Sequence, residues 1–177
     1  MLFVVDLTHQ PNSIFFKGDK QMALKPDRIE LQTDVSFFMS ATATRGGVAS
    51  VSGGGSGVSM DDSAAVVSYA STASGCKPVG VLLNDVVDLD LTRQHINWHK
   101  DEVQKGGKVT LLQVGQVTTS NVTGTPAAGD PAYVGANGNV SATAPTDSDT
   151  EDGYYRIGRF LSSKDADGYA KVAVNVA

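Results

Sequence analysis

The sequence contains a single cysteine, Cys76, in 177 residues. One thiol cannot form an intrachain disulfide, and it cannot supply a structural zinc site that needs several thiolates. Its neighbours are small and uncharged apart from Lys77, which is typical of a small buried side chain rather than a catalytic thiolate. Stability therefore has to come from packing or from partners.

Basic residues are also few. The chain has 14 Lys and Arg residues against 19 Asp and Glu residues, so its formal charge at pH 7 is -5. Proteins that bind the phosphate backbone usually carry an excess or a stripe of basic side chains. The composition therefore predicts no direct nucleic-acid partner.

A long apolar run is missing at the start of the sequence. Residues 1–10 read MLFVVDLTHQ, in which four apolar residues precede Asp6 and no basic segment comes before them. This is too short for a signal peptide or a membrane span. We expect a soluble chain that folds in the cytoplasm and has no membrane partner.

The residues that are abundant point to an all-β fold. Nineteen glycines, with many Ser, Thr, Ala and Val residues, favour short strands joined by tight turns. Residues 171–176 (KVAVNV) alternate at period two, and turn residues 164–168 separate them from a second strand at 154–161, which predicts a hairpin. Residues 130–135 and 140–144 predict another hairpin, because Asn137-Gly138 between them accepts the positive φ angles of a type I′ turn.

Further strands are predicted at residues 87–92 and 108–114, so the second half of the chain has the strand spacing of a small barrel or sandwich. Residues 1–45 mix apolar patches and charged spacers without a sustained period, and we expect them to be an N-terminal arm that becomes ordered on a partner. Residues 46–177 are then the β-barrel-like domain, with a mobile Gly/Ser-rich loop near residues 46–60.

The segment at residues 94–102 (QHINWHKDE) raises the question of a metal site. On a helix, His95 and His99 share one face with Glu102, which would make three ligands conceivable. On an extended chain the two histidine Cα atoms stand roughly 13 Å apart and cannot share an ion. The metalloprotease pattern needs Glu directly after the first His, where the chain has Ile96. A structural connector anchored by Trp98 is favoured, although the helical alternative stays open.

Other sequence patterns of catalytic or ligand sites are incomplete. No Lys-Ser/Thr pair follows the glycines at residues 53–57, so a phosphate-binding loop is not expected. The acidic residues 147–153 lack the Gly and Glu positions of an EF-hand loop. No serine lies in a Gly-x-Ser-x-Gly turn between a strand and a helix. The sequence therefore predicts a protein that is not an enzyme, with no catalytic, cofactor-binding or metal-binding residues and no cofactor.

Several segments, in this order along the chain, resemble the capsid decoration, or cement, proteins of tailed bacteriophages, including the lambda-type head decoration proteins. They cover about residues 75–177: residues 78–87 (PVGVLLNDVV), 97–109 (NWHKDEVQKGGKV), 129–134 (GDPAYV), 157–161 (IGRFL) and 167–172 (DGYAKV). The resemblance implies a compact β-barrel or β-tulip domain that binds the outer surface of the expanded head and stabilises contacts between major capsid protein subunits. It also implies self-association, as trimers in lambda-like members and as monomers or dimers in others.

An arm of this kind can add a strand to a neighbouring sheet edge. We expect residues 1 to about 20 to do so on the capsid, with Leu2, Phe3, Val4 and Val5 as apolar anchors. Two other classes share parts of the pattern. A carbohydrate- or receptor-binding module of a tail fibre should place several exposed aromatic side chains on one face, and a metal-dependent hydrolase would rest on His95, His99 and Glu102.

Overall fold

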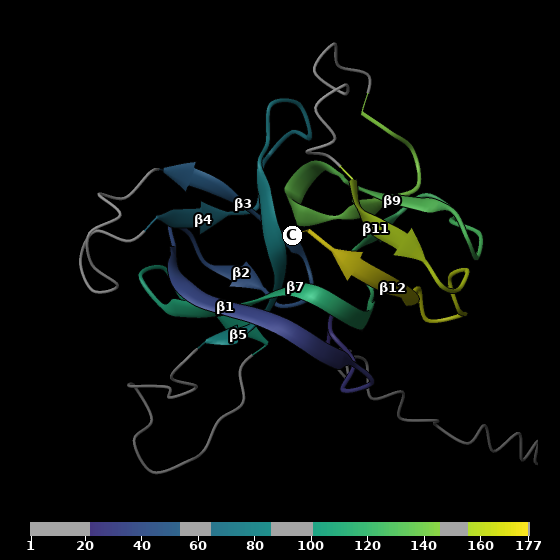
Figure 1. Ribbon diagram of the computed structural model, residues 1–177, viewed down its shortest axis with the longest axis horizontal. Coiled ribbons are helices and arrows are strands. Elements are labelled where there is room, and N and C mark those ends of the chain that lie inside the picture. Colours follow the sequence, from purple (N-terminus) through teal and green to yellow (C-terminus); the bar gives the residue numbers. More distant parts are fainter. Residues whose placement is uncertain (1–21, 54–64, 86–100, 146–155, 177) are drawn as a thin grey trace, which may run out of the picture.

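The computed structural model describes residues 22–53, 65–85, 101–145 and 156–176. These residues form strands and one short 3-10 helix (Figure 1). None of the helices found there is long and apolar enough to cross a membrane. The elements are β1 (Ile29–Met39), β2 (Ala43–Thr44), β3 (Val48–Gly53), β4 (Val66–Ser68), β5 (Pro78–Asp85), β6 (Glu102–Val103), β7 (Lys108–Thr119), β8 (Val122–Thr123), β9 (Pro131–Val134), η1 (Ala136–Gly138), β10 (Val140–Ser141), β11 (Arg156–Phe160) and β12 (Ala170–Asn175).

Ten strands form one sheet in the order β1-β4-β3-β5-β7-β12-β11-β9-β10-β8. Because β1 also pairs with β7, the first five strands of this order close into a ring. The remaining five extend from β7 on the other side, as the two halves of Figure 1 show. The sheet is therefore a ring with an attached second half rather than one simple closed barrel.

Strand β7 belongs to both halves because it is 12 residues long. Its first part pairs with β5, from Val109 opposite Asp85 to Leu112 opposite Val81. Its second part pairs with β12, from Val114 opposite Asn175 to Thr119 opposite Ala170. Its other edge pairs with β1 from Lys108 to Gln116.

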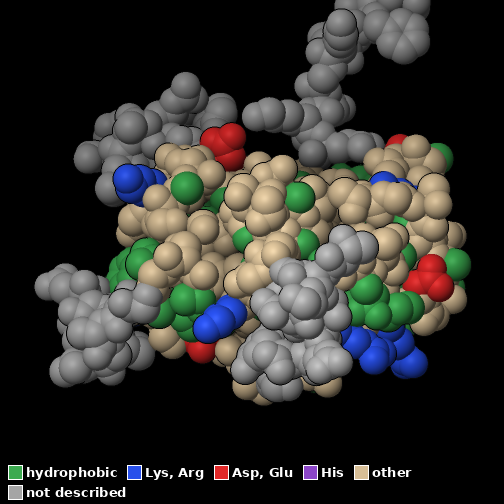
Figure 2. Space-filling view, turned by 90° about the horizontal axis from the view of Figure 1, so that it is seen from above, with side chains coloured by type: hydrophobic (Ala, Val, Ile, Leu, Met, Phe, Trp, Pro, Cys, Tyr) green, Lys and Arg blue, Asp and Glu red, His purple; other side chains and the backbone are tan. Residues whose placement is uncertain are grey.

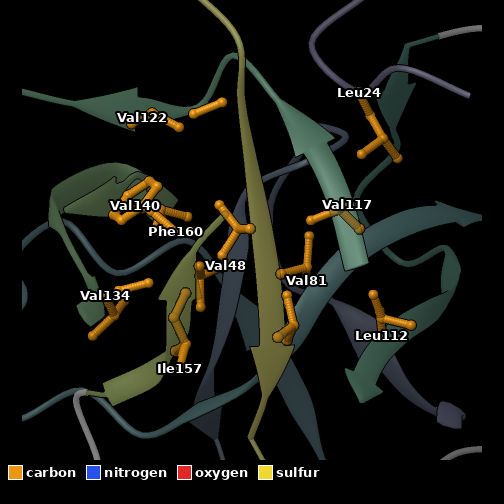
Figure 3. Packing of buried hydrophobic residues seen from close by; sticks show 14 of the residues in the cluster. Leu24, Val48, Val81, Leu112, Val117, Val122, Val134, Val140, Ile157 and Phe160 are labelled. Atoms are coloured by element: carbon orange, nitrogen blue, oxygen red, sulfur yellow. The ribbon is translucent and has the colours of Figure 1, made fainter. Parts of the chain in front are cut away.

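Alternating side chains of the ring strands fill two separate cores. Ala49, Leu82 and Leu111 point into a cluster with Met39, Val67, Val103 and Val109. Their neighbours Val48, Val81 and Leu112 point the other way, into the larger cluster that also contains Ile157 and Phe160 of β11 (Figure 3). Both faces of β3, β5 and β7 are thus apolar, which joins the two halves through packing.

Tyr69 is fixed by polar contacts beside β3 and packs against Gly138 of the second half. Its hydroxyl accepts a hydrogen bond from the Gly47 N–H at 2.9 Å and donates one to the Thr44 carbonyl. The aromatic ring of Tyr69 packs closely on Gly47 and Gly138. A Cβ added to either glycine would lie within 3 Å of the Tyr69 side chain. Burial raises the pKa of Tyr69, which keeps the hydroxyl protonated as a donor.

The all-β class predicted from the sequence is confirmed, and so are both predicted hairpins. β11 and β12 pair antiparallel, as do β9 and β10. Between β9 and β10, Asn137 and Gly138 have φ angles of 56° and 72°, as the Asn-Gly signal requires. The strand expected at residues 108–114 is β7, while the one expected at 87–92 lies outside the described residues.

The structure differs from the sequence-based expectation in two segments of the first half. Residues 48–53, which fall in the expected Gly/Ser-rich loop near 46–60, form β3 between β4 and β5 in the ring. Residues 29–39, within the expected arm of residues 1–45, form β1 and pair with β7. Both strands have interrupted alternation and bulged registers, which hides their period in the sequence.

Candidate interaction surface

The most exposed strand of the described structure is β1. Phe38 and Met39, at its end, pair with β4, and its other edge pairs with β7 from residue 29 to residue 38. Over residues 29–36, none of the strands in the described ranges pairs with the edge that faces away from β7. An open strand edge of this kind can accept a further strand through its backbone groups.

Large apolar side chains of β1 are exposed beside this edge. Leu31 is 74% exposed, Ile29 47% and Val35 39%. Gln32 and Asp34 lie on one face of the strand, because both contact Gln113. Exposed Ile, Leu and Val side chains close together on one strand are typical of a contact surface.

β1 is firmly held against β7. The backbones come so close that a Cβ added to Gly115 would lie 2.1 Å from the Ile29 carbonyl oxygen. Next to a bulge, the Asp34 carboxylate accepts a hydrogen bond from the Ser36 N–H at 2.7 Å. At its end, Met39 is buried in the smaller core. The open edge therefore belongs to a preformed strand, which reduces the entropy lost when a partner binds.

Residues 22–28, which precede β1, are fastened to the rest of the molecule by backbone and side-chain bonds. The Ala23 N–H donates to the Asp101 carboxylate at 2.9 Å, and this carboxylate also pairs with Arg45 at 3.3 Å. Leu24 is buried in the larger core, and its backbone forms an isolated antiparallel β-bridge with Thr119 of β7. The start of the described chain is thus fixed at a defined place on the molecule.

Charged side chains strengthen the same attachment. Lys25 pairs with Asp165 at 3.1 Å and lies over the Tyr169 ring, 4.0 Å from its centre. The pKa of Asp165 is lowered, first by the hydrogen bond from the Tyr169 N–H and then by Lys25. Burial raises the pKa of Tyr169, whose hydroxyl donates to the Met22 carbonyl. A second pair joins Lys171 to Asp27 at 3.2 Å.

A shallow recess of about 370 Å³ lies on the ring, lined mainly by serine and threonine side chains. Cys76 is one of the lining residues, and burial raises the pKa of its thiol, which disfavours the reactive thiolate. Tyr69 is the aromatic residue of the lining, and its ring is occupied by packing against Gly47 and Gly138. The recess therefore provides neither an activated thiol nor a free ring on which a sugar could stack.

The residues singled out from the sequence are distributed as follows. Leu2, Phe3, Val4 and Val5 lie outside the described residues, as do His95, Trp98 and His99. Glu102 is exposed on the short strand β6, where it pairs with Thr44. Within the described part of the chain there is no group of three or more His, Cys, Asp or Glu residues that could hold a metal ion.

Sequence reasoning missed the surface on β1. Residues 29–39 read IELQTDVSFFM, in which apolar residues at 29, 31 and 35 are too irregular to mark one buried face. On the face shown in Figure 2, Lys and Arg side chains are scattered rather than gathered into one basic patch. None of the aromatic side chains in the described ranges is exposed.

A family model described as structural cement protein (E217 gp24/Pam3 gp6), of phages, matches residues 17–175. No curated protein matches the sequence. The matched range includes every described strand, from β1 to β12.

Proposed function

The chain belongs to the family of phage structural cement proteins, and from this premise we propose that it binds the outer surface of the expanded head and stabilises contacts between major capsid protein subunits. The observation that carries the proposal is the extent of the family match, residues 17–175 of 177. Membership makes the chain a structural part of the virion capsid. The major capsid protein as direct partner, and assembly in the host cytoplasm, belong to the proposal.

A rigid molecule suits such a role. Two apolar cores share the ring strands, and the segment before β1 is tied down by hydrogen bonds and ion pairs. A protein that binds only the assembled capsid lattice stabilises this lattice by mass action. The stabilisation is about 2.7 kcal/mol per site when the free protein is at 100 times its Kd. This role needs no catalytic group, and we propose that the protein acts without enzymatic activity.

The cement role predicts that heads carrying the protein tolerate more heat than undecorated heads. Purified expanded heads would be heated with and without the full chain, and disruption followed by calorimetry and by release of packaged DNA. We expect the transition to move to higher temperature as protein is added, until the binding sites are filled. Equal tolerance with and without the protein would contradict the proposal. An unrelated acidic protein of similar size serves as the control.

The attachment to the capsid is proposed to involve the N-terminal arm, with Leu2, Phe3, Val4 and Val5 as apolar anchors. Residues 1–16 precede the range matched by the family, so they could carry contacts particular to one capsid. Residues 2–7 (LFVVDL) have the β-branched and aromatic composition of a strand that adds to a sheet edge.

Deletion of residues 2–16 tests the arm. We expect the shortened chain to keep its melting temperature, since this deletion leaves both cores intact, and to bind expanded heads at least about tenfold more weakly, or 1.4 kcal/mol. Co-sedimentation with heads measures binding. A matched control replaces residues 2–16 with a Gly/Ser segment of equal length. Undiminished binding by the deleted chain would overturn the role of the arm but not the cement function, which the heat experiment tests separately.

Self-association is also part of the proposed function. The resemblance to lambda-like decoration proteins favours three copies, with one or two copies as the alternatives.

A further inference from the structure

The strands of the second half carry charged side chains of one sign only. Strands β8 to β12 contain three charged residues, Arg156, Arg159 and Lys171, and all three are basic. The part of β7 that pairs with β12, from Val114 to Thr119, is uncharged. The chain as a whole has a formal charge of -5. A sheet whose charge is opposite to that of the whole molecule is suited to attract a negatively charged partner.

The strand registers place both arginines on the face that points away from the larger core. Strands β9, β11 and β12 lie side by side (Figure 1). Arg159 lies opposite Ala173 and Pro131, and Arg156 lies opposite Tyr133. Directly opposed residues project from the same face of a sheet. The other face of these strands is buried in the larger core through Ala132, Val134, Ile157, Phe160, Val172 and Val174. Both arginines are therefore exposed on the outer face.

Neither arginine is neutralised within the described part of the chain. The four ion pairs found there involve other basic residues, and one of them holds Lys171 to Asp27 at 3.2 Å. The Arg156 Nε donates to the Gly158 carbonyl, at 3.5 Å, and contacts no carboxylate of the described residues. No side-chain hydrogen bond to these residues involves the Arg159 guanidinium. Two cations on this face are thus available to a partner.

The surroundings of the arginines fit a protein surface that bears carboxylates. Ala173 and Pro131 beside Arg159 are small, so that a flat surface can approach the guanidinium. A guanidinium donates two parallel hydrogen bonds to one carboxylate. Arg and Tyr are also enriched among the residues that dominate protein interfaces, and Tyr133 lies partly exposed opposite Arg156. Proteins that hold nucleic acid neutralise several phosphates at once, for which two free arginines are too few.

The segment that leads to the N-terminal arm borders the same face. Its Asp27 carboxylate pairs with Lys171, which projects from the outer face of β12 between buried neighbours. The Met22 carbonyl, where the arm begins, accepts a hydrogen bond from the hydroxyl of Tyr169, the residue before β12. The arm, for which capsid binding is proposed, therefore leaves the molecule beside the strands that carry the free arginines.

We infer that the outer face of β9, β11 and β12 docks on an acidic surface of the major capsid protein, an inference that rests on the cement function proposed above. Carboxylates of that protein pair with Arg156 and Arg159, while the arm engages the same shell from the adjacent border. Two contacts on one molecule strengthen each other, because the second forms at the effective concentration set by the first. Attraction between opposite charges also orients the protein as it approaches the head.

Charge reversal tests the face. Arg156→Glu combined with Arg159→Glu should weaken binding to expanded heads at least about tenfold, as the loss of dominant interface residues does. The melting temperature should stay the same, because both side chains are exposed. Lys77→Glu combined with Lys105→Glu is the matched control, since it changes the net charge equally at exposed positions next to β5 and β7 of the ring. Co-sedimentation measures binding, and the gap between wild type and the arginine variant should narrow as salt rises.

A zero-length cross-link tests the chemistry of the partner. A carbodiimide activates a carboxylate, which then forms an amide with a nearby primary amine, while the carbodiimide takes up the water and becomes a urea. The guanidinium of arginine does not react in this way. Arg159→Lys places an amine on the face and should be joined to an Asp or Glu of the coat protein on decorated heads, as located by mass spectrometry. The wild type should give no link at position 159.

The outcomes separate this face from the cement function. Undiminished binding by the double arginine variant, or an equal loss in the lysine control, would exclude the face. Absence of the cross-link from Arg159→Lys bound to heads would exclude carboxylates as the groups contacted. If the arginine variant binds heads like the wild type but loses an affinity of the wild type for duplex DNA, the face serves nucleic acid instead. In each case a wild type that still protects heads from heat keeps its cement function, whereas a wild type that does not bind heads loses both.

Discussion

At the scale of single residues, close backbone approach decides which glycines the fold needs. Gly115 of β7 lies under β1, and Gly158 of β11 lies under β12, where an added Cβ would be 1.9 Å from the Ala173 carbonyl oxygen. Gly106 also has a positive φ, of 80°, but nothing lies within 4 Å of the position its Cβ would take. A side chain at Gly106 would therefore meet only an unfavourable backbone conformation, whereas a side chain at Gly115 or Gly158 would also collide with the neighbouring strand.

Gly115→Ala should destabilise the protein much more than Gly106→Ala. The Gly106 variant carries only the cost of a left-handed backbone, about 1 to 2 kcal/mol. The Gly115 variant also pushes β1 away from β7, and we expect a loss of more than about 4 kcal/mol, in the range of severe core changes. Urea denaturation measures both free energies of unfolding. Equal losses for the two variants would show that β1 does not press on Gly115.

At the scale of elements, strands with local turn signals could be predicted and strands without them could not. Asn137-Gly138 and Asp167-Gly168 mark their hairpins directly, and β9 to β12 follow from them. β3 is rich in Gly and Ser, and is a strand only because β4 and β5 flank it. β1 is exposed over most of its length, so it has no buried face for a periodic pattern to reveal.

The candidate surface was inaccessible to sequence reasoning for the same reason. The exposure of Leu31 and the open edge beside it follow from pairing with β7, which is distant in the chain. The arm anchors Leu2, Phe3, Val4 and Val5 stay a prediction, because they lie outside the described residues.

The attachment of residues 22–28 depends on Asp101. Asp101→Ala removes the acceptor of the Ala23 N–H and the partner of Arg45, and hydrogen bonds to charged groups contribute about 1.5 to 3 kcal/mol. We expect faster hydrogen exchange at the Ala23 and Lys25 amides, measured by mass spectrometry of peptides from this segment. Asp130→Ala is the control, because Asp130 accepts a bond from the Ala127 N–H at 2.8 Å in a different loop. Unchanged exchange in Asp101→Ala would show that Asp101 does not hold the segment.

At the scale of the whole molecule, the shared strands make the two halves one unit. Val48 and Val81 of the ring pack in the same cluster as Ile157 and Phe160 of the second half (Figure 3). Either half would expose one face of β3, β5 and β7 if the other were removed. The ring and the second half should therefore unfold together rather than in sequence.

Phe160→Ala tests this cooperativity. Phe160 is fully buried, and its loss should cost about 3 to 5 kcal/mol, as for other large core side chains. Calorimetry should show one transition at lower temperature, without a second transition for the ring. Phe38→Ala, at a partly exposed position near Lys108, should cost less. Two separate transitions would mean that the halves are independent.

The dependence of β1 on β7 has a consequence for biosynthesis. Ile29 pairs with Gln116, so the ring cannot close until translation has passed β7 and this strand has left the ribosome. Until then the nascent chain has to keep Leu31 and its neighbours from sticking to other polypeptides, and non-local pairing of this kind is slow. Pauses in translation ahead of Lys108, or a shortage of chaperones during infection, should therefore lower the yield of folded protein more than similar disturbances later in the message.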